Sequence, residues 1–205
     1  MADLISAFPR SLYSEAKAVA GVLQHHLKSP SNAIEVRICD EAIAIPYRVY
    51  GGEHALVYYN DEPFRLLAGL LRAQDFNERQ QLMFFCLLSR HHNGFVREAA
   101  LCRIAASPEA FIVPFVAQLA SEYVYEILLQ ISLRLPELEP QLYGAFFRGN
   151  PAYFARLRQR MISYWNVYYR WQDYTSPDGE MRHAWRDHYV GFDIFDAFDA
   201  MIKVT

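Results

Sequence analysis

The chain has 205 residues, a net charge of -3 and a hydrophobic fraction of 53%. These values are typical of a globular protein of one domain and exclude a disordered chain, which could not bury enough apolar surface. They also argue against a protein whose whole surface binds nucleic acid, because such proteins carry a clear basic excess.

Membrane association and disulfide bonding are not expected. The sequence opens without a basic segment followed by an apolar stretch, and no apolar run approaches the roughly 18 residues that span a bilayer. The cysteines Cys39, Cys86 and Cys102 are odd in number and scattered, which favours reduced thiols. We therefore predict a cytoplasmic protein that contacts no membrane.

The N-terminal part combines a helical period with a strand period. Residues 11–28 are predicted to form an amphipathic helix, because apolar residues recur there at steps of three and four. This stripe consists of Leu12, Ala16, Val19, Leu23 and Leu27. Apolar side chains then alternate with others on both sides of residues 39–42, which predicts a β-hairpin over residues 34–50. Since a lone hairpin is marginally stable, we expect it to pack on helices.

From residue 61 onward the pattern is helical. Helices are predicted near residues 61–74, 77–91, 94–106, 108–119, 121–135, 137–147 and 151–172, and a last one near 180–202 after a turn at 175–179. Several starts place Asn or Ser before a proline, as in Asn150-Pro151. Such residues are expected to cap the helix that follows.

Three of these segments share a pattern, in which Phe64, Val96 and Val124 are each followed by apolar residues at helical spacing. The middle segment, "NGFVREAAL", resembles the second helix of HEAT repeats, and the match covers roughly residues 61–135. The resemblance implies a stack of antiparallel helix pairs that binds macromolecules along a concave surface. We therefore expect a mainly α, HEAT-like single domain over residues 1–205, with a repeat-like core at 61–147 and C-terminal helices at 151–202.

Two side-chain pairs are the candidates for chemistry. His91 and His92 are adjacent, so on a helix they point about 100 degrees apart and do not readily share a metal. We interpret them, like His25 and His26, as residues at a helix end, and Arg97 as a structural contact between repeats. His183 and Asp187 are four residues apart and would share a helix face, as in a two-ligand metal clip, although most such pairs are solvated.

No stretch of the sequence matches a Walker loop, a GxGxxG turn after a strand, a GxSxG elbow, an HExxH motif or paired CxxC motifs. We therefore predict no catalytic residue, no metal site and no cofactor, and a binding protein in preference to an enzyme. A metal-dependent enzyme that uses His183 and Asp187 is the least favoured alternative.

The charge distribution changes sharply toward the C-terminus. Residues 141–172 contain five arginines and no acidic residue, whereas residues 173–199 contain seven acidic residues and two arginines. One interpretation is that the acidic segment folds back against the basic helix. The other is a binding surface rich in Tyr, Trp and Arg, the residues that dominate interfaces. Its candidate residues are Arg156, Arg160, Tyr164, Trp165, Tyr168, Tyr169, Arg170 and Trp171.

These features predict a module that binds another protein. Its most specific form is a bacterial-type cytoplasmic immunity protein or antitoxin, because a small, mildly acidic domain without catalytic motifs suits stoichiometric inhibition. The alternative is a HEAT-like nucleic-acid-binding or base-repair protein, since some alkylpurine DNA glycosylases are built from HEAT-like repeats and Arg interleaved with aromatic residues suits base stacking.

Overall fold

The computed structural model describes residues 3–29, 32–51, 69, 71–175, 181–183 and 189–204, with the backbone alone for residues 173–175, 182 and 183. The fold is mainly α-helical, as predicted. Contacts divide the chain into two compact units, Met1–Val116 and Ala117–Thr205, here called unit 1 and unit 2. Within the described ranges no helix combines the length and apolarity needed to cross a bilayer. The prediction of a single domain stays a prediction.

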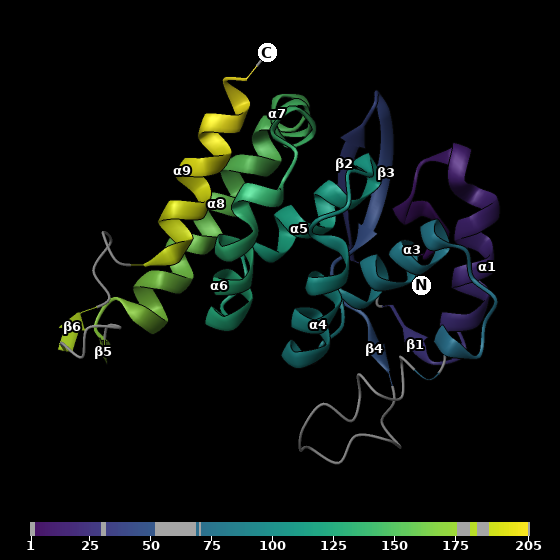
Figure 1. Ribbon diagram of the computed structural model, residues 1–205, viewed down its shortest axis with the longest axis horizontal. Coiled ribbons are helices and arrows are strands. Elements are labelled where there is room, and N and C mark those ends of the chain that lie inside the picture. The colour runs from purple at the N-terminus through teal and green to yellow at the C-terminus, as the bar shows by residue number, and fades with distance from the viewer. Residues whose placement is uncertain are drawn as a thin grey trace. The chain divides into compact units, whose positions relative to one another are not determined.

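Unit 1 contains helices and two small antiparallel sheets (Figure 1). The described helices are α1 (Tyr13–Leu23), α3 (Glu78–Leu88) and α4 (Gly94–Ile104), with 3-10 turns at Ile5–Ala7, Arg10–Leu12 and Ala110–Ile112. The strands are β1 (Leu27–Lys28), β2 (Ala33–Ile38), β3 (Glu41–Pro46) and β4 (Tyr50–Gly51), and β1 pairs with β4 as β2 pairs with β3. Helix α5 (Val113–Leu119) crosses the boundary between the units.

The first helix is shorter than its apolar stripe predicted. It ends at Leu23, and Leu27 lies instead in strand β1 opposite Gly51 of β4. A side chain at Gly51 could not be accommodated, because a Cβ atom there would lie 2.1 Å from the carbonyl oxygen of His26. Leu27 is still buried. The apolar stripe therefore predicted its burial correctly, although Leu27 lies in a strand and not in the helix.

The predicted hairpin is confirmed as β2 and β3, with Ile38 opposite Glu41. It ends at Pro46 and not at residue 50, because Tyr50 pairs with β1 instead. Cys39 and Asp40 form the turn, and both have positive φ angles, 47° and 66°, as a type I′ turn requires. The hairpin was expected to pack on helices, and β3 contacts the 3-10 turn Ile5–Ala7 at the start of the chain. There the backbone N–H of Arg10 donates to the Glu41 carboxylate at 3.0 Å.

Side-chain caps set the starts of α3 and α4. Asn77 accepts a hydrogen bond from the backbone N–H of Gln80, and the Gln80 side chain accepts one from the N–H of Asn77, so the two form a capping box. Asn93 accepts from the N–H of Phe95 at 2.9 Å. The turn at residues 93–94 thus begins a helix, as the sequence indicated.

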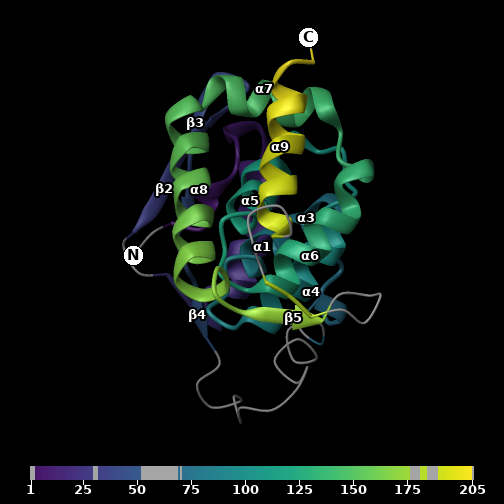
Figure 2. The same ribbon diagram turned by 90° about the vertical axis from the view of Figure 1, so that its left-hand side faces the viewer.

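Unit 2 is a group of helices with a short hairpin. Its described helices are α6 (Tyr125–Arg134), α7 (Pro140–Gly149), α8 (Pro151–Tyr164), the π-helix Trp165–Tyr169 that continues α8, a 3-10 turn at Leu135–Glu137, and α9 (Val190–Ile202). The hairpin consists of β5 (Asp173–Thr175) and β6 (Met181–His183). Helix α8 lies beside α9 in both views (Figures 1 and 2).

Two predictions for unit 2 are wrong in part. The helix expected over residues 180–202 starts only at Val190, because residues 181–183 pair with β5 as a strand. Asn150 does not cap α8 with its side chain; its Nδ2 donates instead to the carbonyl of Phe146 in α7 at 2.8 Å. Asn150 joins two helices, and the unpaired carbonyls at the end of α7 compete for its amide.

The core of unit 2 is aromatic where α7, α8 and α9 meet. Phe198 of α9 contacts Phe147 of α7 with ring centroids 4.9 Å apart, and Phe195 lies 5.7 Å from Phe154 of α8. Helices α7 and α9 approach closely at Gly144, where a Cβ atom would lie 2.2 Å from the Met201 carbonyl oxygen. This packing holds α8 in place and leaves its outer side to solvent.

Of the three repeat anchors, Val96 is buried in α4 and Val124 immediately precedes α6, whereas Phe64 lies outside the described residues. The HEAT-like stack therefore stays a prediction.

Candidate binding surface

The two adjacent histidines lie in the turn between α3 and α4, not in a reactive cluster. His91 is 2% exposed, and its Nδ1 accepts a hydrogen bond from the backbone N–H of Asn93 at 3.1 Å. Burial, together with the nearby positive charges of His92, Arg97 and Arg48, lowers the pKa of His91 to about 3. The imidazole is therefore neutral at physiological pH and serves as a structural acceptor.

Two buried arginines bind backbone carbonyls around the same turn. Arg97 donates from Nη1 to the carbonyls of His91 and His92 at 2.9 and 2.8 Å. Arg90 donates from Nη2 to the carbonyl of Tyr47 at 2.7 Å and so holds the residues that follow the hairpin. Arg97 is structural as predicted, but these two bonds lie within the α3–α4 turn and not between repeats.

The second candidate pair does not form the predicted helical clip. His183 lies in strand β6 and not in a helix, so it cannot share a helix face with Asp187 as expected. Asp187 lies outside the described residues. His25 and His26 are exposed in the turn after α1. In the described part of the chain, no group of three or more His, Cys, Asp or Glu side chains could hold a metal ion.

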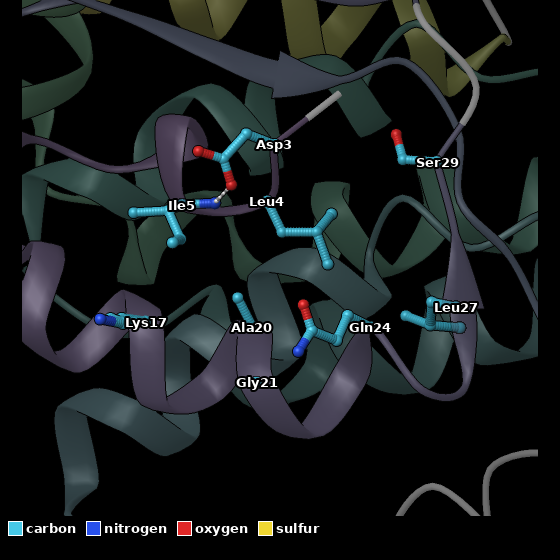
Figure 3. Close-up of a pocket in the computed structure, with 9 residues that line it drawn as sticks. All are labelled: Asp3, Leu4, Ile5, Lys17, Ala20, Gly21, Gln24, Leu27 and Ser29. Carbon is cyan, nitrogen blue, oxygen red and sulfur yellow. Dashed lines mark hydrogen bonds between the residues drawn. The ribbon is translucent and has the colours of Figure 1, made fainter. Parts of the chain in front are cut away.

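A pocket of about 340 Å³ opens in unit 1 between α1 and the first residues of the chain (Figure 3). Its lining is largely aliphatic, with Leu4 and Leu27 facing the space. Asp3 at its edge already accepts a hydrogen bond from the backbone N–H of Ile5 at 3.0 Å. Lys17 and Gln24 are exposed at the rim. Among the described lining residues, therefore, none is the desolvated charged group that marks a catalytic pocket.

The charge reversal at the C-terminus is partly resolved by packing. Arg158 of α8 forms an ion pair with Asp199 of α9, and its guanidinium lies over the rings of Phe154 and Phe195. Arg148 donates from Nη1 to the carbonyls of Ile202 and Val204, both at 2.7 Å. The acidic helix thus does pack on the basic one through Arg158, whereas Arg148 lies in α7 and bonds to backbone carbonyls.

The predicted aromatic residues separate into two groups, of which the first is a tyrosine face. Tyr164 and Tyr168 are four residues apart, and their rings lie 6.0 Å from one another. Both rings contact Tyr123, which comes from the segment before α6, at 5.8 and 6.0 Å. Arg160 lies over the Tyr164 ring at 5.8 Å, and Arg156 is exposed one helical turn earlier. We define the tyrosine face as Tyr123, Tyr164, Tyr168 and Arg160.

The second group is a tryptophan–arginine stack, formed by Trp165, Arg170 and Trp171. The guanidinium carbon of Arg170 lies 5.4 Å from the Trp165 ring and 4.8 Å from the Trp171 ring. Nη1 of Arg170 donates to the side-chain oxygen of Asn166 at 2.9 Å. Trp165 in turn packs edge-on against Phe192 of α9 at 5.2 Å. Arg170 therefore contacts two indole rings and the Asn166 side chain.

The π-helix is the local cause of this arrangement. The backbone N–H of Arg170 donates to the carbonyl of Trp165, five residues earlier, at 2.8 Å. This wider turn brings residues five apart closer to one side of the helix than an α-helix would. Arg170 consequently stacks on Trp165. Such single π turns are rare and often occur at functional sites.

Tyr169, another residue predicted for the surface, is half-buried and packs against other aromatic side chains of unit 2. Its hydroxyl donates to the carbonyl of Tyr123, and its ring packs against Tyr125 and Tyr189. Burial, with the nearby Glu126 carboxylate, raises the pKa of Tyr169. Tyr169 therefore ties the π-helix to the segment before α6 and remains partly exposed.

Sequence reasoning missed Tyr123 and Val167, which are 47% and 68% exposed. Tyr123 lies 41 residues before Tyr164, and Val167 has no aromatic ring, so a search of one aromatic segment overlooks both. The signal for Tyr123 was the tyrosine pair in "SEYVYE", where a single helix face cannot bury both rings.

Comparison with protein-family models, with curated proteins and with solved structures finds no match. The candidate surface therefore depends on the geometry of this chain.

Proposed function

We propose that unit 2 binds a partner protein through the tyrosine face and the tryptophan–arginine stack. The main evidence for the proposal is that large aromatic side chains of unit 2 are exposed to solvent and are not packed in its core. Tyr168 is 49% exposed and Trp171 is 77% exposed. Large exposed aromatic groups beside arginine are typical of interface centres, where they lose most water contact on binding.

The packing of unit 2 supports a surface that is ready to bind. Tyr164 and Tyr168 contact Tyr123 from another segment, and Arg170 is held by two rings and Asn166. Side chains that are already ordered lose less conformational entropy on association, so more of the contact energy remains as affinity. In its most specific form the proposal is an immunity-type inhibitor, which would form a stoichiometric complex and block its partner's activity.

Affinity capture with surface variants tests the proposal. The full-length chain, tagged, is used as bait beside a double variant, Tyr168→Ala with Trp171→Ala. We expect recovery of a saturable protein partner to fall by at least about tenfold in the double variant, since interface aromatic residues commonly contribute more than 1 kcal/mol each. Quantitative mass spectrometry of the captured proteins measures this change.

Leu133→Ala is the matched control, because Leu133 is 63% exposed on α6 and is also apolar. Its recovery should equal that of the wild type, and circular dichroism should show all three baits folded. Equal recovery by the control and the double variant would contradict the proposal, as would the failure of any protein to bind saturably.

Binding to nucleic acid is the competing outcome. It predicts a shift of single-stranded DNA in a gel at low salt that weakens steeply as salt rises. Charge reversal by Arg156→Glu and Arg160→Glu should then abolish the shift. A flat titration at low salt excludes this alternative.

A further inference from the structure

We infer that the partner presents an acidic segment and that one of its carboxylates binds Arg170 in the tryptophan–arginine stack. This inference rests on the protein-binding function proposed above and names the chemistry that the surface selects.

The geometry of Arg170 favours a carboxylate. Its guanidinium carbon lies 5.4 Å from the centre of the Trp165 ring and 4.8 Å from that of Trp171, within the range of cation–π contacts. Its N–H groups lie in the plane of the guanidinium, and one of them bonds to Asn166. The other in-plane donors form the planar fork that a carboxylate fits with two parallel hydrogen bonds.

The described charges leave Arg170, and also Arg156, available to a carboxylate. Residues 141–172 contain no acidic residue. Arg148 is bound to backbone carbonyls and Arg158 is paired with Asp199. Arg170 is exposed and makes no ion pair with the residues that the structure describes, and the same is true of Arg156. A partner that brings a carboxylate would complement this positive charge.

The neighbouring helix argues for a protein segment and against a polyanion. Asp193 and Asp196 are exposed on α9, whose Phe192 contacts Trp165 of the stack. A nucleic-acid backbone would bring many phosphates close to these carboxylates, whereas a single carboxylate on Arg170 faces less repulsion. Trp171, which is largely exposed, offers an apolar contact for the residue beside that carboxylate.

A peptide titration tests the inference. The probes are short acetylated peptides of alternating Glu and Leu, the matched peptides of alternating Gln and Leu, and single-stranded oligothymidine. Binding to the full-length chain is followed by the side-chain Nε–H resonance of Arg170 in a nitrogen-15 spectrum. We expect the Glu peptide to bind at least about tenfold more tightly than the Gln peptide, because it makes charged hydrogen bonds.

Arg170→Met should remove this preference while keeping a long side chain at the position. Arg103→Met is the matched control, since Arg103 is also exposed and lies over an aromatic ring, that of Phe85 in unit 1, at 5.9 Å. The preference should persist in that control.

Equal binding of the two peptides to the wild type would overturn the inference, and so would a preference that survives Arg170→Met. Tighter binding of oligothymidine than of the Glu peptide would assign the stack to nucleic acid instead. One outcome separates the two proposals. If capture of a protein depends on Tyr168 and Trp171 while the Glu and Gln peptides bind equally, the proposed protein-binding function stands and the inference of an acidic partner segment fails.

Discussion

Buried polar side chains in the α3–α4 turn show how individual residues link the elements of unit 1. Arg90 and Arg97 donate to backbone carbonyls, and His91 accepts from the backbone of Asn93. A buried donor or acceptor is costly when left unbonded, so these bonds specify one conformation of the turn. The stability of unit 1 should therefore depend on keeping His91 neutral.

Acid should destabilise the chain through His91. The pKa of His91 is lowered to about 3 in the folded chain, whereas an exposed histidine in the unfolded chain titrates near 6.5. The unfolded state therefore binds the proton more readily below pH 6.5. His91 then removes about 1.4 kcal/mol of the free energy of unfolding per pH unit as pH falls toward 3.

Denaturant unfolding at a series of pH values measures this dependence. His91→Asn keeps an oxygen acceptor for the Asn93 amide and cannot titrate, so its stability should fall less steeply between pH 6.5 and 4 than that of the wild type. His25→Asn, in an exposed turn, should retain the wild-type slope. The same slope in wild type and His91→Asn would show that His91 does not set the pH dependence.

At the scale of elements, helix contacts in unit 2 decide which side of α8 is open. Helix α9 covers Phe154 and Arg158, and Tyr153, Leu157 and Met161 are buried. These contacts do not cover the tyrosine face, which is therefore exposed to solvent. The close contact of α7 with α9 at Gly144 maintains this arrangement.

Gly144→Ala should separate α7 from α9. The added methyl group would lie 2.2 Å from a backbone oxygen of Met201, and a backbone atom moves less readily than a side chain. We expect the free energy of unfolding to fall by about 3 kcal/mol, the upper range for an overpacked core. Chemical denaturation measures the loss.

Gly149→Ala is the control in the same helix, because nothing lies within 4 Å of the position its Cβ would take. Its stability should stay within about 0.5 kcal/mol of the wild type. A similar loss in both variants would mean that helix flexibility matters and not the α7–α9 contact.

At the scale of the whole molecule, each unit buries an aromatic or aliphatic core of its own. Phe8 packs on Phe111 and Phe115 within unit 1, while Phe147 and Phe198 pack within unit 2. Cores that are formed separately can open separately, as regions of one chain often do. A mutation that disrupts one core should therefore destabilise mainly the unit that contains it.

Hydrogen exchange of the Gly144→Ala variant tests this separation. We expect faster amide exchange in α6, α7, α8 and α9 and rates close to wild type in α1, α3 and α4. Exchange followed by mass spectrometry of peptic fragments resolves these helices. Uniform acceleration over both units would show instead that the chain opens as one cooperative unit.

Local patterns in the sequence predicted the mainly α fold, a hairpin with its turn within residues 39–42 and the helix start at Asn93. Each of these follows from residues close together in the chain: the period of apolar residues, a turn segment or a cap. The composition of the candidate surface was also visible, because arginine and aromatic residues cluster between residues 156 and 171.

Only the tertiary structure decided how that cluster is used. It bonds the Tyr169 hydroxyl to the Tyr123 carbonyl, brings Arg170 within cation–π distance of two indole rings and adds Tyr123 to the surface. It also makes residues 181–183 a strand and directs the Asn150 amide to α7. Each of these outcomes depends on a partner group from another element or a competing neighbour, and sequence periodicity contains no information about which partner lies opposite.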